Sequence, residues 1–300
     1  ENVVFVTSQN DAKEVVDVFA TMNNPSDSTT AFKIDAILNS QNDLELIKKY
    51  DSLGVDRIFI DLEILGKKER QGHLDTVISE HSIEDIKKIK PHLNNSKLLV
   101  RINPINMNSR LEIDTCIGYG ADIIMLPMFK TKKEVETFIS FVNKRAKVCL
   151  LIETTQALCR IDDILEVNGI DEIHIGLNDL HLAMNLNFMF ELLSGGIVDY
   201  LSNKIKNKNI PFGFGGIATL DSGMISGEMV LKEHIRLDSS IVILSRAFKN
   251  VAAEDFAKFE KEFLKLKLRL EELKKDKNID FISNIKEIKN IEKAMEFIEE

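Results

Sequence analysis

Two carboxylate residues near the middle of the chain are spaced in a way that suits a metal site. Glu153 ends one apolar run, and Asp179 follows the next, 26 residues further on. If these runs are neighbouring strands of a parallel sheet, both side chains lie at the same edge of it. Carboxylates without thiols or paired histidines make a hard site that suits Mg2+ or Mn2+ and leaves positions open for a bidentate substrate. The alternative is that each carboxylate caps the following helix or pairs with a lysine.

An arginine and a glycine-rich segment stand at the ends of two further apolar runs. Arg101 ends the run KLLVR, where an unpaired guanidinium would be costly, so it must meet a carboxylate of the protein or of a substrate. Beside a metal it would also stabilise an enolate oxygen, whereas the structural alternative is a pair with Asp61 or Glu63. The segment GFGGIA, with Gly215 and Gly216, resembles a phosphate- or carboxylate-binding turn, although glycines also serve tight turns.

Eight apolar runs recur along the chain, and each is followed by a polar stretch with helical periodicity. A strand, a helix and two short loops need about 25 residues, and near-continuous apolar strands indicate a parallel sheet covered on both faces. Eight such units predict an α/β fold closed into a (β/α)8 TIM barrel. A doubly wound sheet would carry a GxGxxG turn after its first strand, where this chain has LNSQND. The predicted strands are 32–38, 56–62, 97–102, 121–127, 147–153, 172–177, 210–215 and 239–245.

The repeat divides the chain into three parts. We expect an N-terminal extension of unknown role at 1–30, a catalytic barrel at 31–250 and a C-terminal helical extension at 251–300. Two intervals exceed the repeat and place insertions at 63–81 and 178–196, after the second and sixth strands. Loops that follow strands build the active site of such barrels, so both insertions are expected on that face.

The C-terminal extension carries a narrow apolar stripe at helical spacing. Its aromatic and leucine residues stand three or four positions apart. The stripe either covers the barrel of its own chain or packs on a neighbouring subunit, and the sequence leaves both possibilities open. Its members are Phe256, Phe259, Phe263, Leu266, Leu270 and Leu273.

Composition argues against two classes of partner. The net charge of -9 at pH 7 and the pI of about 5.4 disfavour a nucleic acid or an anionic membrane surface. No apolar run approaches the roughly 18 residues of a membrane span, and the start of the chain lacks the pattern of an export signal. The three cysteines show no CxxC spacing, which suits buried thiols in a reducing compartment. We therefore expect a cytoplasmic protein with a small-molecule substrate.

Five segments carry a resemblance to a known family. In chain order they are GVDRIFIDLE (54–63), LLVRINP (98–104), GADIIMLPM (120–128), LLIETTQAL (150–158) and IDEIHIGLNDL (170–180). Together they resemble the HpcH/HpaI aldolase and citrate lyase beta-subunit family, within the phosphoenolpyruvate and pyruvate-binding barrel superfamily. The similarity spans roughly residues 31 to 250 and implies a TIM barrel that breaks or makes a carbon–carbon bond.

The resemblance also implies residue roles. Glu153 and Asp179 would hold the divalent metal, Mg2+ or Mn2+, and Arg101 would bind the carboxylate or enolate oxygen of the substrate. The acidic pair would orient metal-bound water or neighbouring polar groups. Asp61 is expected to take part in substrate binding and Glu63 in catalysis. The expected reaction is aldolase-type lyase chemistry through a metal-stabilised enolate of pyruvate or a related 2-oxo acid. A homo-oligomer with exchanged C-terminal helices is a further implication.

One position departs from the family pattern. Ile64 stands where aldolase members carry a proton-transferring His and where citrate lyase-like members carry another Asp. The insertion that follows offers His73 and His81 as general acid or base, because the histidine pKa lies near neutrality, and Arg70 as an anion binder. The bland alternative is that both histidines are exposed loop residues.

Two alternatives to the aldolase reaction stay open. One is a citryl-CoA or malyl-CoA type lyase, which takes an acyl-CoA substrate and draws its enolate from a thioester. The other is a catalytically silent homologue retained for assembly or regulation.

Overall fold

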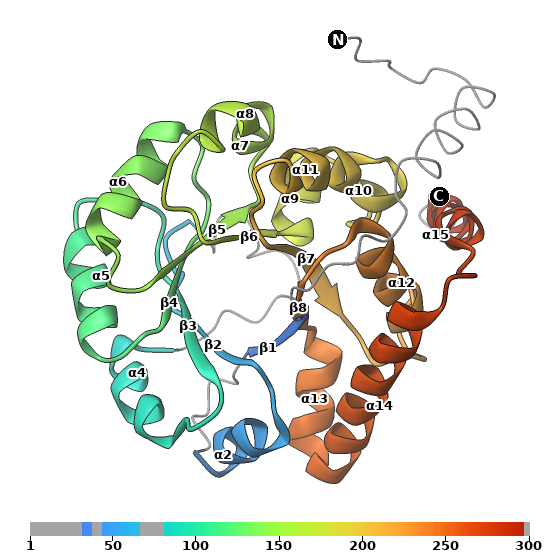
Figure 1. The fold of residues 1–300 in the computed structure, drawn as a ribbon, viewed down its shortest axis with the longest axis horizontal. Coiled ribbons are helices and arrows are strands. Elements are labelled where there is room, and N and C mark those ends of the chain that lie inside the picture. Colours follow the sequence, from blue (N-terminus) through green and yellow to red (C-terminus); the bar gives the residue numbers. More distant parts are fainter. Residues whose placement is uncertain (1–31, 38–43, 67–80, 297–300) are drawn as a thin grey trace.

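Eight parallel strands close into a barrel in the computed structural model, which describes residues 32–37, 44–66 and 81–296. Each strand pairs with the next one along the chain, and β1 pairs with β8 to close the ring. Helices surround the strands as an outer layer (Figure 1). The predicted (β/α)8 TIM barrel is thereby confirmed, and each predicted strand overlaps an observed one. The predicted extension at 1–30 lies outside the described residues.

The strands are short and largely buried, because one face of each meets the helices and the other meets the barrel interior. β2 and β4 bury every residue. Three aspartates fix the amino ends of the barrel: Asp56, Asp122 and Asp171 each accept a hydrogen bond from a backbone N–H near the start of the preceding strand. The strands are β1 (Lys33–Ile37), β2 (Arg57–Asp61), β3 (Lys97–Arg101), β4 (Ile123–Leu126), β5 (Lys147–Ile152), β6 (Glu172–Ile175), β7 (Phe212–Ile217) and β8 (Ile241–Leu244).

Local sequence signals set the ends of several helices in the outer layer. The α6 helix begins at a capping box between Thr131 and Glu134 and ends at Asn143 in the left-handed conformation. No helix of the described residues is both long and apolar enough to cross a membrane. The helices are α2 (Leu44–Leu53), α4 (Ile83–Ile89), the 3-10 helix η1 (Lys90–His92), α5 (Ser109–Gly118), α6 (Lys132–Val142), α7 (Thr155–Cys159), α8 (Ile161–Ile164), α9 (Leu177–Ala183), α10 (Glu191–Ser194), α11 (Ile197–Lys206), α12 (Gly227–Leu237), α13 (Arg246–Glu254), α14 (Phe256–Lys275) and α15 (Phe281–Glu296).

The barrel interior is filled by an apolar layer above a buried ion cluster. At the amino end of the strands, Arg57 binds Glu172 through two hydrogen bonds, one of them 2.7 Å long, and its Nε lies 3.6 Å from Asp35. Burial raises the pKa of Asp35 to about 7. The apolar layer separates this cluster from the carboxyl ends of the strands, so the interior is a packed core. Its members are Phe59, Leu99, Ile123, Met125, Cys149 and Leu151.

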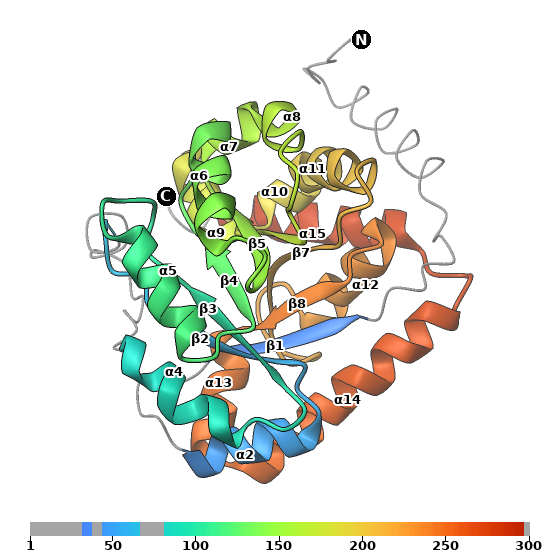
Figure 2. The same cartoon turned by 60° about the vertical axis from the view of Figure 1, so that its left-hand side comes forward.

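The apolar stripe of α14 packs on its own barrel. From Phe259 to Leu273 its members are at most 4% exposed, and the Phe259 ring lies 4.9 Å from that of Tyr50 in α2. Figure 2 shows α14 along the outside of the barrel, with one end beside α2 and α13. The first of the two expectations for the stripe is therefore confirmed. The second, an interface with a neighbouring subunit, stays a prediction that the burial of these side chains does not support.

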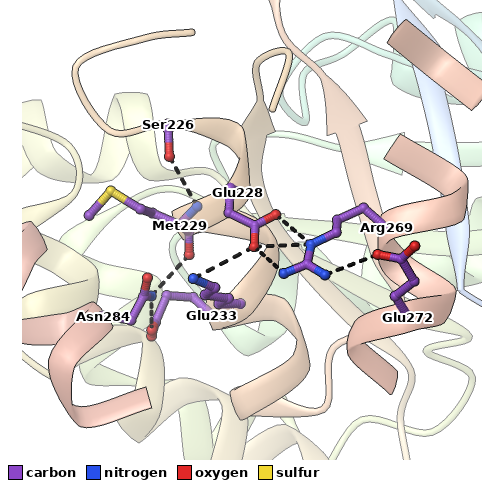
Figure 3. A network of polar contacts seen from close by, with 8 residues as sticks. Ser226, Glu228, Met229, Glu233, Arg269, Glu272 and Asn284 are labelled. Carbon is purple, nitrogen blue, oxygen red and sulfur yellow. Dashed lines mark hydrogen bonds and ion pairs between the residues drawn. The ribbon is translucent and has the colours of Figure 1, made fainter. Parts of the chain in front are cut away.

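Polar contacts attach the two last helices to α12. Arg269 of α14 donates to both oxygens of Glu228, at 2.7 to 3.1 Å, and to Glu272 (Figure 3). The amide of Asn284 in α15 donates to the Met229 carbonyl and to the Glu233 carboxylate. The C-terminal helices therefore belong to the same packed unit as the barrel.

A pair of leucines in α14 tests this placement. Leu266 is 1% exposed, so Leu266→Ala is expected to lower the free energy of unfolding by about 2 to 5 kcal/mol. Leu268 is 64% exposed, so Leu268→Ala is expected to change it by no more than about 0.5 kcal/mol. Urea unfolding followed by circular dichroism measures both. Equal losses in the two variants would contradict the packing of α14 described above.

Candidate active site

The polar residues predicted to do chemistry gather at the carboxyl ends of β2, β3, β5 and β6. Asp61 and Arg101 end β2 and β3 and are register partners in the sheet. Glu153 follows β5 directly, and Asp179 lies in the first turn of α9, which follows β6. The sheet therefore brings together residues that are far apart in sequence, as the repeat predicted.

Arg101 is held by the two carboxylates that end β2. Its Nε and one terminal nitrogen donate to the two oxygens of Asp61, both at 2.8 Å, and its other terminal nitrogen lies 3.5 Å from Glu63. The Arg101 side chain is 15% exposed, and those of Asp61 and Glu63 are 7% and 1% exposed. The structural pair left open by the sequence is thus present, and it fixes the plane of the guanidinium at the carboxyl end of the barrel.

Glu153 is a buried carboxylate beside other negative charges. It is 2% exposed, and one of its oxygens accepts a 3.0 Å hydrogen bond from the Met128 N–H. Burial raises its pKa to about 8, the charges of Asp179 and Glu63 act in the same direction, and only Arg101 and the Met128 bond oppose them. The cap of the following helix is Thr154, so the alternative in which Glu153 caps that helix is wrong.

This environment fits a divalent cation. A buried carboxylate whose ionised form is disfavoured by burial and by two nearby carboxylates gains most from a positive ion. Within the described ranges, no three His, Cys, Asp or Glu side chains form a complete ligand set. If Glu153 and Asp179 hold an ion, its other positions are left to water and substrate, which is the usual arrangement for Mg2+.

His81 lies beside Asp61, although the two are twenty residues apart. It is 8% exposed, and its Nδ1 accepts a 3.1 Å hydrogen bond from the Asp61 N–H. A ring nitrogen that accepts carries no proton, so the neutral ring carries its proton on Nε2. The alternative that His81 is an exposed loop residue is wrong. Arg70 and His73 lie outside the described residues.

The glycines of β7 pack closely against the start of α9. Gly215 has a φ of +53°, and a Cβ at this position would lie 2.8 Å from Leu177. The Gly215 carbonyl accepts a 3.0 Å hydrogen bond from Nε2 of the buried His174. These contacts account for a glycine at 215 through packing. The predicted substrate-binding role of Gly215 and Gly216 stays a prediction.

Gly176 is a site residue that the sequence alone did not identify. A Cβ on this residue would lie 3.0 Å from both the Cβ and an oxygen of Glu153. A side chain at the end of β6 would therefore require Glu153 to shift by a few tenths of an ångström. Glycine before a helix is too common for this requirement to be read from the sequence.

The space next to Glu153 gives a direct test. Gly176→Ala is expected to shift the Glu153 carboxylate by a few tenths of an ångström and to weaken Mn2+ binding by about 10-fold, measured by titration calorimetry. Gly118→Ala is the matched control, because a Cβ there meets no atom within 4 Å. If Gly176→Ala binds Mn2+ as the parent does, the Glu153 carboxylate beside Gly176 is not a ligand of the ion.

Comparisons with known proteins agree on the type of barrel. The family model described as HpcH/HpaI aldolase/citrate lyase matches residues 38–189. An HpcH/HpaI aldolase from Desulfitobacterium hafniense superimposes with a TM-score of 0.58 at 15% identity, covering 77% of this chain and 93% of the other. Citrate synthase SbnG superimposes with a TM-score of 0.55 at 17% identity, covering 77% of this chain and 94% of the other. Macrophomate synthase superimposes with a TM-score of 0.54 at 14% identity, covering 85% of this chain and 90% of the other. At these identities the structures support the fold alone, and no curated protein matches the sequence.

Proposed function

Because the chain belongs to the HpcH/HpaI aldolase/citrate lyase family, we propose that it is a divalent-metal-dependent carbon–carbon lyase of the aldolase type. Its proposed substrates are 4-hydroxy-2-oxo acids, which it cleaves to an aldehyde and the enolate of pyruvate or a related 2-oxo acid. The observation that carries the proposal is the buried Glu153, whose pKa is raised to about 8, beside Asp179 and Arg101 at the carboxyl end of the barrel.

Glu153 and Asp179 are the proposed metal ligands. When bound, Mg2+ or Mn2+ would supply Lewis-acid stabilisation of the negative charge that develops on the 2-oxo oxygen. Glu153 directly follows β5 and Asp179 lies in the first turn of α9, so both stand outside the apolar layer of the barrel interior, at the face where substrates of such barrels bind.

Arg101 is the proposed binding group for the substrate carboxylate or enolate oxygen. Asp61 holds two of its nitrogens at 2.8 Å, which fixes the direction of the guanidinium before the substrate arrives. A donor fixed in advance stabilises developing charge without reorganising during the reaction. Asp61 therefore contributes to substrate binding through Arg101.

Proton transfer is assigned to His81 and Glu63. Retro-aldol cleavage removes a proton from the 4-hydroxyl group as the bond between C3 and C4 breaks, and the enolate later takes up a proton at C3. His81 lies against Asp61, and Glu63 lies next to Arg101, so both belong to the same group of residues. His73 as a second proton carrier and Arg70 as an anion binder remain predictions.

Substrate screening in the presence of Mn2+ or Mg2+ tests the proposal. We expect cleavage of 4-hydroxy-2-oxo acids and exchange of the pyruvate methyl protons with deuterium from the solvent, followed by proton NMR. Cleavage of citryl-CoA or malyl-CoA without pyruvate exchange would instead support the thioester lyase that the family also contains. No reaction with either class would favour the catalytically silent homologue.

The homo-oligomer also remains a prediction. The α14 stripe gives it no support, because the barrel of the same chain covers that stripe. Sedimentation of the full chain measures its state of association.

A further inference from the structure

The backbone turn that carries Glu63 is hydrogen-bonded almost entirely to β3 and the residues that follow it. The Leu62 N–H donates to the Arg101 carbonyl at 2.9 Å. The next N–H, that of Glu63, donates to the Asp61 carboxylate at 3.1 Å. After it, the N–H groups of Ile64 and Leu65 both donate to the side-chain oxygen of Asn103, at 3.0 and 3.1 Å. Every backbone N–H from 62 to 65 therefore has a named partner.

Asn103 holds this turn from both sides of Glu63. Its amide oxygen accepts from the two residues after Glu63, and its amide nitrogen donates at 3.2 Å to the carbonyl of Leu62, the residue before it. The same amide nitrogen donates to Glu112 of α5 at 2.8 Å, and the Asn103 backbone N–H donates to that oxygen at 3.2 Å. Glu112 thus fixes the orientation of the Asn103 side chain.

Glu63 provides the charge beside the one Arg101 nitrogen that Asp61 does not hold. Glu63 is 1% exposed and lies 3.5 Å from the Arg101 nitrogen that Asp61 does not bind. In the proposed function Arg101 binds the substrate, so a displaced Glu63 would change the charge and the orientation of this edge of the guanidinium.

We propose that Asn103 and Glu112 are positioning residues, which fix the turn at Glu63 and through it the edge of Arg101 that Asp61 does not hold. The expected effect of Asn103 and Glu112 on turnover rests on the proposed function. Their expected effect on the orientation of Arg101 does not depend on any reaction. Asparagine suits position 103 because its side chain accepts and donates at once, which aspartate cannot do when ionised.

Four variants and one control test the inference. Asn103→Ala removes all the side-chain bonds, and Asn103→Asp keeps the acceptor but loses the donor. Glu112→Ala removes the partner, whereas Glu112→Gln keeps an acceptor oxygen for Asn103. Asn106→Ala is the control, because Asn106 stands in the same loop and, among the described residues, its side chain bonds to Pro104 and Asn108 and not to the turn at Glu63.

Three measurements are made on each variant: steady-state kinetics with a 4-hydroxy-2-oxo acid, hydrogen exchange of the 62–66 backbone, and the Nε–H NMR signal of Arg101. Asn103→Ala, Asn103→Asp and Glu112→Ala are expected to lower kcat by about 10- to 100-fold. Their backbone exchange is expected to accelerate and their Arg101 signal to shift. Glu112→Gln and Asn106→Ala are expected to behave like the parent in all three.

The outcomes separate this inference from the proposed function. An unchanged kcat and an unchanged Arg101 signal in Asn103→Ala would overturn the positioning role, even if backbone exchange accelerates. A parent protein that turns over no substrate would defeat the proposed function. In that case the Arg101 signal alone decides, with a shift in Asn103→Ala supporting the positioning role and no shift overturning it.

Discussion

Glu153→Gln is expected to lose metal-dependent turnover by at least about 100-fold while the barrel stays folded. The glutamine side chain keeps an oxygen that accepts from the Met128 N–H, but it lacks the negative charge that a cation needs. Asp179→Asn is expected to act in the same direction, and chelation of the metal by EDTA should reproduce the loss in the parent. Steady-state kinetics and Mn2+ titration measure both effects.

The stability of Glu153→Gln separates a metal ligand from a structural carboxylate. The pKa of Glu153 is raised from 4.5 to about 8, so ionising this group in the folded protein is unfavourable. That cost is absent below pH 4.5 and grows as the pH rises to about 8. Without metal, Glu153→Gln is therefore expected to be more stable than the parent at pH 8, and added Mn2+ should stabilise the parent alone. A variant less stable than the metal-free parent at pH 8 would point to a structural role.

The pH dependence of metal binding follows from the same group. A ligand must be deprotonated to bind a cation, so the apparent affinity for Mn2+ is expected to rise with pH up to about 8 and then to level off. Glu166→Gln is a suitable control, because this exposed carboxylate pairs with Lys132 on the surface, away from the strand ends.

Arg101→Met is expected to lower the free energy of unfolding at neutral pH by about 3 to 5 kcal/mol and to abolish measurable turnover. The reason is that Asp61 and Glu63, 7% and 1% exposed, would lose the positive charge that compensates them. Arg101→Lys keeps the charge but not the two parallel hydrogen bonds to Asp61, so most of the stability should remain. Its turnover is nevertheless expected to fall by about 100-fold, because an ammonium group cannot hold the same orientation.

A surface arginine provides the comparison for both variants. Arg145 pairs with Asp114 through side chains that are about 40% exposed, so Arg145→Met should cost less than about 1 kcal/mol. Urea unfolding and steady-state kinetics are measured on all three. Full turnover in Arg101→Lys would show that the guanidinium geometry is not needed, and would remove Arg101 from the proposed mechanism.

The sequence predicted the barrel because the strands leave a strong signal. Each is a nearly continuous apolar run, buried on both faces, and the polar residues that end β2, β3 and β5 stand out against that background. The common edge of a parallel sheet then implies that Asp61, Arg101 and Glu153 are neighbours. Pairing and burial thus follow from pattern and topology alone.

Features that depend on a particular contact in space could not be predicted in this way. The space beside Gly176, the contact of His81 with Asp61, and the two-sided bonding of Asn103 each join residues through geometry that leaves no periodic signal. The α14 stripe shows the same limit, because an apolar helix face looks alike whether its own barrel or another subunit covers it. Only the packed fold decides that question.

The ion cluster and the apolar layer close the interior of the barrel at the amino ends of the strands. Arg57 and Glu172 are at most 3% exposed and the apolar layer above them at most 4%, so the described residues leave no route to Arg101 and Glu153 through the amino end of the barrel. Two reactants that both enter from the carboxyl end of the barrel must bind one after the other. Under the proposed function, with the 2-oxo acid on Arg101, we expect this fragment to bind first in condensation and to leave last in cleavage. The kinetic order of the two partners would then depend on the closed amino end of the barrel, far from the bond that is broken.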